Sequence, residues 1–165
     1  MQKAKKTNTR SMIIFFTLFL IIGTAVFIGY REYTKKQDKE LINNPVNQPI
    51  GVDINVKNLI AETHAKYNEL TGYGAIDQLD SDKAIQLSNR VKTESSQALK
   101  HGIKDKRLNE DFSAIQKIAA KTSEQPEKEK VRLLHRYFHD LDIAVNRYKD
   151  TNTVFGVTKT LPKRK

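Results

Sequence analysis

The chain has 165 residues, of which 29 are basic and 19 acidic, so its formal net charge is +10, and it contains no cysteine. This length is enough for one domain, and the lack of cysteine excludes disulfides, thiolate metal ligands and cysteine nucleophiles. Nucleic-acid binding proteins usually cluster their cations on one face with aromatic residues between them. The basic residues of this chain are instead mixed with acidic ones, and we therefore expect no nucleic-acid partner.

An uncharged apolar stretch begins close to the N-terminus. Residues 1–11 form a basic arm without an acidic residue, and residues 12–30 then run Met-Ile-Ile-Phe-Phe-Thr-Leu-Phe-Leu-Ile-Ile-Gly-Thr-Ala-Val-Phe-Ile-Gly-Tyr. At ~1.5 Å per residue, a helix of this length reaches about 29 Å, close to the roughly 30 Å of a bilayer's hydrocarbon core. The stretch predicts one transmembrane helix with membrane lipid as its partner.

The distribution of basic residues predicts the orientation of this helix. The arm carries four cations, and residues 31–40 carry four cations together with three acids. Orientation follows the Lys and Arg residues near the ends of a span, and acids contribute little to it. The counts are equal, but the N-terminal cations are grouped on a short arm that is easily retained. We expect a single-pass protein of the cell membrane with a cytoplasmic N-terminus and with residues 31–165 outside.

A cleaved signal peptide is the alternative interpretation of the same stretch. Residues 1–11 would be its basic region, residues 12–22 its apolar region, and Gly23-Thr24-Ala25 its cleavage site. A cleaved peptide usually turns polar after that site, whereas Val26-Phe27-Ile28 continue the apolar run. We therefore favour an uncleaved signal anchor.

The anchor is followed by a connecting region, a main domain and a tail. Residues 31–52 combine a charged stalk with a linker rich in asparagine and proline, and proline interrupts both helix and sheet. Residues 53–150 are predicted to form the domain, and residues 151–165 a basic C-terminal tail. Val154, Phe155 and Val157 favour an extended segment in this tail, and we expect Phe155 to hold the tail against the domain together with Tyr148.

Four segments of the domain place apolar side chains at alternating steps of three and four, the spacing of one helix face. The stripes are Val56, Ile60, Thr63, Tyr67 and Leu70; Ala84, Leu87, Val91 and Ala98; Leu108, Phe112, Ile115 and Ala119; and Val131, Leu134, Phe138, Leu141, Val145 and Tyr148. The predicted fold class is all-α. It consists of a single N-terminal transmembrane helix followed by a small extracytoplasmic up-and-down bundle of three to four helices.

Capping residues and breakers predict where these helices begin and end. Asn55 is the expected N-cap of the first helix, with Ile54 and Leu59 as a hydrophobic staple, and the glycines at 72 and 74 end it. Asp80 or Ser81 is expected to cap the second helix, and the third begins near Asp105. The segment 122–126 is expected to break the third helix, with Pro126 in the first turn of the fourth.

The search for catalytic and cofactor motifs finds no phosphate-binding glycine loop, no G-x-S-x-G and no H-E-x-x-H. One constellation remains: His135 and His139 lie four residues apart on one helix face, and Asp142 follows. Imidazoles at this spacing can share a metal ion with a carboxylate as third ligand. Residues flanking a core stripe are more often boundary residues, so we expect no metal, no cofactor and no catalytic residue. His64 or His101 completes a site only if the bundle brings it near.

The favoured function is therefore a non-enzymatic interaction or adaptor module. Lysine exceeds arginine 21 to 8 and tryptophan is absent, a bias that indicates an AT-rich bacterial genome. We expect a bacterial envelope protein whose helical bundle docks on another envelope protein. One alternative is a metal-binding sensor or metal-dependent enzyme built on His135 and His139. Another is a structural tether that contacts anionic membrane lipid or wall polymer through Lys159, Lys163, Arg164 and Lys165.

Overall fold

The computed structural model describes residues 9–44, 47–49, 51–101, 103–148 and 153–161. Within these ranges the chain forms five α-helices and one 3₁₀ segment, and no β-strand. It divides into two compact units, Met1–Asp38 and Lys39–Lys165. The predicted all-α fold class is therefore confirmed for the described ranges.

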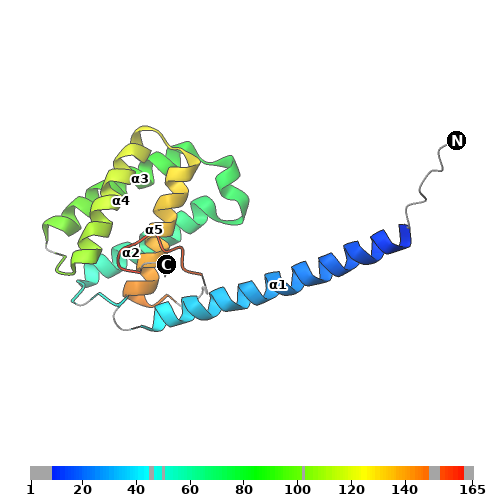
Figure 1. The fold of residues 1–165 in the computed structure, drawn as a ribbon. Helices are drawn as coiled ribbons and strands as arrows, with labels where there is room; N and C mark the ends of the chain where they lie inside the picture. Colours follow the sequence, from blue (N-terminus) through cyan, green and yellow to red (C-terminus); the bar gives the residue numbers. More distant parts are fainter. Residues whose placement is uncertain (1–8, 45–46, 50, 102, 149–152, 162–165) are drawn as a thin grey trace. The chain divides into compact units, whose positions relative to one another are not determined.

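Helix α1 (Thr9–Asn43) contains the predicted membrane span (Figure 1). It is the one helix in the described part of the chain that is long and apolar enough to cross a membrane. Its apolar 18-residue window has a mean hydropathy of 2.6, and none of that window is buried. Residues 12–33 are all exposed. The hydroxyls of Thr17 and Thr24 donate to carbonyl oxygens of their own helix, at 2.9 Å to Ile14 and to Ile21 respectively, so these polar groups are satisfied internally.

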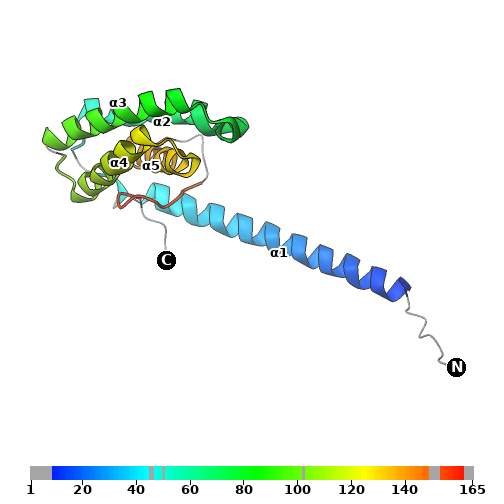
Figure 2. The ribbon, with the colours of Figure 1, turned by 90° about the horizontal axis from the view of Figure 1, so that it is seen from above.

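The second unit is a bundle of four helices. Helix α2 (Ile54–Thr71) leads through the 3₁₀ segment η2 (Gly72–Gln78) into α3 (Ser81–Lys100), which is followed by α4 (Lys106–Glu124) and α5 (Lys128–Asn146). The most extensive contacts join α3 to α4 and α2 to α5. Figure 2 shows α2 and α3 in one layer above α4 and α5. The seam between α2 and α5 carries the polar side chains discussed below.

The predicted apolar stripes form the core of this bundle. The stripe residues of α2 are all buried, as are all four of α4. On α3, Leu87 is half-buried and the serines at 88 and 95 are buried beside it. The first four stripe residues of α5 are fully buried, whereas Val145 is half-buried. At about 1.5–3 kcal/mol for each fully buried large apolar side chain, this shared face is the main source of stability in the unit.

Two predicted helix starts are confirmed and one is wrong. Asp80 and Asp105 cap α3 and α4, each accepting a backbone N–H from the first turn. Helix α2, however, is capped by Asp53, which accepts the N–H of Asn55 at 2.7 Å. Asp and Asn are equally good N-caps, but the negative charge of Asp53 also interacts favourably with the helix N-terminus. Ile54 is 62 % exposed, so it forms no hydrophobic staple.

The later helix boundaries also differ from the prediction. Helix α4 continues through Thr122, whose hydroxyl donates to Ile118 O at 2.8 Å, and it ends at Glu124. Pro126 precedes α5 instead of lying in its first turn, because Glu127 is the N-cap. Helix α5 ends at Asn146, since the next residue adopts a left-handed conformation with φ of 57°. Tyr148 therefore lies beyond the helix stripe to which the spacing assigned it.

A second apolar cluster joins the end of α1 to the end of α5. It consists of Leu41, Ile143, Ala144, Val154 and Leu161, with Ile42, Val145 and Tyr148 packed against it. Leu41 belongs to α1 and Leu161 to the C-terminal segment, so the compact unit extends on both sides of the range 53–150 that the sequence predicts for the bundle. Three parts of the sequence predictions lie outside the described residues: residues 1–8 of the basic arm, Pro45 of the linker, and the tail cations at 163–165.

Candidate functional site

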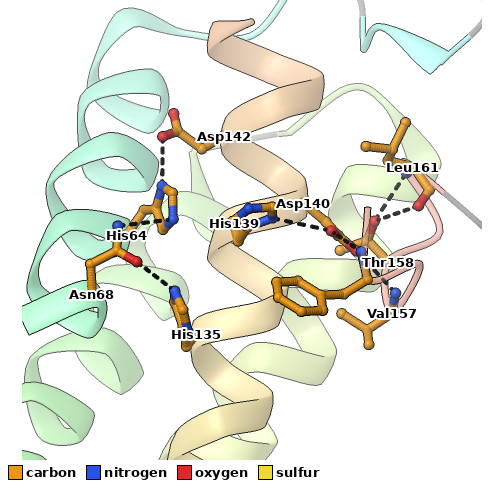
Figure 3. A network of polar contacts seen from close by, with 10 residues as sticks. His64, Asn68, His135, His139, Asp140, Asp142, Val157, Thr158 and Leu161 are labelled. Carbon is orange, nitrogen blue, oxygen red and sulfur yellow. Dashed lines mark hydrogen bonds and ion pairs between the residues drawn. The ribbon is translucent and has the colours of Figure 1, made fainter. Parts of the chain in front are cut away.

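The structure brings His64 of α2 next to the predicted histidine pair of α5. The ring centroid of His64 lies 5.7 Å from that of His135 and 5.1 Å from that of His139. The ring centroids of His135 and His139 are 6.2 Å apart. His64 and His139 are buried, and His135 is half-buried. Figure 3 shows His64 facing the two rings of α5 across the seam. We call His64, His135 and His139 the histidine cluster.

Asp142 holds one side of His64. The Nδ1 atom of His64 lies 2.8 Å from Asp142 Oδ2, and both side chains are almost completely buried. The other carboxylate oxygen accepts the side-chain N–H of Asn146 at 2.7 Å, and Asn146 also donates to the carbonyl oxygen of Lys57. Both oxygens of Asp142 are therefore bonded inside the seam. Because a carboxylate only accepts, the Nδ1 atom of His64 carries a hydrogen.

Asn68 links His64 to His135. Its Nδ2 atom lies 3.2 Å from His64 Nε2, and its Oδ1 atom lies 2.7 Å from His135 Nε2. The remaining nitrogen of His135, Nδ1, lies 3.0 Å from the hydroxyl of Thr71. That hydroxyl is also 2.8 Å from the carbonyl oxygen of Tyr67. A continuous chain of hydrogen bonds thus runs from Asp142 to the last residue of α2.

His139 faces the C-terminal segment instead. Its ring centroid lies 4.8 Å from that of Phe155 with an angle of 66° between the ring planes, and the guanidinium of Arg136 covers the Phe155 ring. The Nδ1 atom of His139 is buried without a hydrogen-bond partner among the described residues, although Asp140 Oδ1 is 3.5 Å away. Phe155 therefore contacts the bundle as the sequence predicts.

Two buried aspartates fasten the backbone of the C-terminal segment. Asp140 accepts the N–H groups of Phe155 at 2.9 Å and Val157 at 3.0 Å. Asp111 of α4 accepts the N–H groups of Lys159 at 2.7 Å and Thr160 at 2.9 Å, and also the Thr160 hydroxyl. Figure 3 shows Asp140 facing this segment. The segment is thereby tied to two helices of the bundle.

Burial and neighbouring charges set the protonation of two of these groups. Burial, together with the smaller effects of His64, His139 and Arg136, lowers the pKa of His135 from an ordinary value of 6.5 to about 4. His135 is therefore neutral at pH 7. Burial raises the pKa of Asp111, and the hydrogen bonds from Lys159 and Thr160 oppose that rise.

The geometry bears on the metal hypothesis in two ways. The bundle does bring His64 beside the predicted pair, whereas His101 lies at the C-cap of α3 and lines a different cavity. Across the described ranges, however, no three His, Asp or Glu side chains are placed to hold one metal ion. Both nitrogens of His64 and His135 and both oxygens of Asp142 are hydrogen-bonded within the protein. The arrangement is that of an internal polar network.

Sequence reasoning missed the two aspartates that hold the C-terminal segment. A weak signal was present, because Asp111 precedes Phe112 and Asp140 precedes Leu141 on the apolar edges of their helices. Buried carboxylates need hydrogen-bond donors, but the sequence does not show which segment supplies them. A scan of family models, a search of curated proteins and a search of solved structures each found no match to the chain.

Proposed function

We propose that the chain is a single-pass membrane protein of the bacterial cell envelope and that its helical unit is a non-enzymatic docking module for another protein. The apolar surface of α1 supports the membrane anchor, since residues 12–33 are exposed along the whole span. Such a surface is stable in lipid and unfavourable in water. The grouping of Lys and Arg on the N-terminal arm supports a cytoplasmic N-terminus.

The observation that carries the docking role is a hollow of about 660 Å³ between α2 and α3. Apolar side chains from both helices and the adjoining loops line it: Val52, Val56, Leu59, Ala98 and Ile103. Charged groups of both signs line it as well: the acids Asp53, Glu62, Glu94 and Asp105, and the bases Arg90 and Lys104. An apolar patch with a polar rim is the usual anatomy of a protein interface.

One polar atom of this hollow supports the same proposal. Arg90 donates to Glu94 Oε1 at 2.7 Å and to Glu62 at 3.2 Å. The second oxygen of Glu94, Oε2, is buried without a hydrogen-bond partner among the described residues. An unsatisfied carboxylate oxygen is unfavourable, and a rotation of the Glu94 side chain on docking would bring it to a basic or amide group of the partner.

Site-specific photo-crosslinking in cells tests the docking role. A photoreactive residue at Asn58 or Gln97, which line the hollow, should crosslink to one and the same protein. Controls at Lys117 and Lys121, both exposed on α4, should not capture that protein. Equal capture from both helices, or no capture from the hollow, would argue against a docking role.

Fractionation and protease treatment test the anchor and its orientation independently. The full chain should remain in the membrane fraction after a carbonate wash, and protease added outside the cell should digest nearly all of it. Release of a fragment beginning near Val26 would favour a cleaved signal peptide instead. Protection of the whole bundle from external protease would indicate the opposite orientation, with the bundle inside the cell.

A further inference from the structure

The hydrogen-bond chain in the seam can be assigned in more than one way. An amide shows its oxygen and nitrogen almost identically, and a neutral imidazole carries its hydrogen on either nitrogen. The positions of the heavy atoms in the chain Asp142–His64–Asn68–His135–Thr71 fit one neutral set of donors and acceptors, and two sets with an extra proton, on His64 or on His135. His64 is bonded to the acid Asp142, whereas His135 is bonded to the neutral groups of Asn68 and Thr71, so the extra proton belongs on His64. The neutral set and the set protonated at His64 differ by one proton.

In the first assignment every imidazole is neutral. His64 Nδ1–H donates to Asp142, and the Asn68 amide N–H donates to His64 Nε2. His135 Nε2–H donates to Asn68 Oδ1, and the Thr71 hydroxyl donates to His135 Nδ1. That hydroxyl has a single hydrogen and therefore cannot also donate to the carbonyl oxygen of Tyr67, 2.8 Å away.

In the second assignment His64 carries one more proton, on Nε2. The Asn68 amide is turned over, so that its oxygen accepts from His64 and its N–H donates to His135 Nε2. The hydrogen of His135 is then on Nδ1 and donates to the Thr71 hydroxyl. The hydroxyl is free to donate to Tyr67 O, so all five contacts are made. His135 remains neutral in both assignments.

We propose that the seam is a binding site for a single proton, which His64 holds and which reverses the hydrogen-bond chain as far as Thr71. The proton comes from solvent: His64 gains one at Nε2, while His135 loses one at Nε2 and gains one at Nδ1. The net change is one proton and one positive charge. The side chain of Asp142 lies 2.8 Å from His64 and balances that charge.

The groups around His64 limit the site to one proton. From α5, Asp142, His135 and His139 face it, and the Tyr148 ring lies 5.0 Å away. Within the described ranges, Asp142 is the acid in direct contact with His64. A second proton on either neighbouring imidazole would place two positive charges within ring centroid distances of 5.1–5.7 Å. The depressed pKa of His135 agrees with this limit.

The inference does not rest on the docking role or on the orientation of the anchor. It has a structural consequence at the end of α2, because Thr71 is the last residue of that helix and η2 follows directly. In η2, Tyr73 is fully exposed and has a left-handed backbone with φ of 50°. The protonation state of a buried histidine is thus coupled to the residue that precedes an exposed aromatic loop.

Nitrogen-detected NMR of the full chain in detergent micelles, labelled with ¹⁵N-histidine, tests the proposal. As the pH is lowered, both nitrogens of His64 should become protonated. At the same midpoint His135 should change from the Nε2–H to the Nδ1–H tautomer and stay neutral. An unchanged His135 tautomer throughout the His64 titration, or protonation of His135 before His64, would overturn the proposal.

Two variants separate the relay from an independent titration of His64. Asn68→Leu removes the link at an exposed position, so the bundle should fold while the His135 tautomer no longer follows His64. Thr71→Val removes the final acceptor, and the midpoint of His64 should move to lower pH. Asn89→Leu, at an exposed position of α3 outside the chain, should behave as wild type. Coupled titration of the two histidines that persists in Asn68→Leu would refute the relay.

Discussion

The buried carboxylate of Asp140 accepts the backbone N–H of Phe155 at 2.9 Å and so attaches the C-terminal segment to the middle of α5. Its second oxygen accepts the N–H of Val157. The same segment supplies Val154 and Leu161 to the apolar cluster that contains Leu41 of α1. The end of the chain is therefore a structural part of the helical unit, and it contacts the last turn of α1.

Removal of this carboxylate should destabilise the unit. In Asp140→Ala the two backbone N–H groups lose their acceptor, and each unpaired buried group costs about 1–3 kcal/mol. We expect a loss of about 2–4 kcal/mol in the free energy of unfolding by denaturant titration. Glu110→Ala, an exposed acid on α4, is the control and should change stability by less than about 0.5 kcal/mol. Equal effects of the two substitutions would show that the hydrogen bonds between Asp140 and the C-terminal segment contribute nothing to stability.

The core stripe of α5 makes a second stability prediction. Leu141 is completely buried, so Leu141→Ala leaves a cavity and should cost about 2–5 kcal/mol. Lys117→Ala on the exposed face of α4 is the matched control, and we expect it to be neutral within about 0.5 kcal/mol. Urea unfolding followed by far-UV circular dichroism measures both. A spectrum without strong helical bands would contradict the fold itself.

The fold could be predicted from the sequence to the extent that it depends on local spacing. The stripes at Val56–Leu70 and Leu108–Ala119 lie within single helices, and the periodicity of the residues therefore identifies them. The site depends on long-range contacts instead. His64 and Asp142 are 78 residues apart, and Asp111 and Lys159 are 48 apart. No local sequence pattern pairs such distant residues. The contacts in the seam, and the hydrogen bonds that Asp111 and Asp140 accept from the C-terminal segment, were therefore not predicted.

The stability of the unit should depend on pH through His135. Its pKa is about 4 in the folded chain and 6.5 ordinarily, so the unfolded chain binds more protons between these values. Stability is therefore complete above about pH 6.5 and falls as the pH drops toward 4, because protonation favours the unfolded state. Thermal melts between these pH values should show this decline, and His135→Gln should make it shallower. An identical pH profile for the variant would assign the decline to other groups.

We expect no stoichiometric zinc in the purified protein. The nitrogens of His64 and His135 already have protein partners, and a metal ion would have to displace Asn68 and Thr71 from them. Chelator should therefore leave the melting temperature unchanged, both in wild type and in the double variant His135→Ala, His139→Ala. Elemental analysis provides the direct measurement. One equivalent of tightly bound zinc, lost in the double variant, would support the metal-binding alternative instead.

The tether alternative requires that the C-terminal cations touch an anionic surface. Truncation at residue 150 is a poor test, because it also removes Thr160 from Asp111 and Leu161 from its apolar cluster. The matched test is Lys163→Gln, Arg164→Gln, Lys165→Gln, which removes charge and leaves 153–161 intact. Each cation near an anionic bilayer contributes about 1 kcal/mol, so three contribute roughly 3 at best.

Such a contribution cannot anchor a free protein firmly, but it is effective in a chain that α1 already holds at the membrane, where the second contact is intramolecular. A soluble form beginning at Lys39 should therefore bind vesicles of anionic lipid weakly at low salt, and the triple variant should bind more weakly still. The difference should shrink at physiological salt, because exposed charges are screened beyond about 8–10 Å. Neither protein should bind vesicles of neutral lipid. Equal binding of the two proteins to anionic vesicles at low salt would remove the tether as an explanation for these cations.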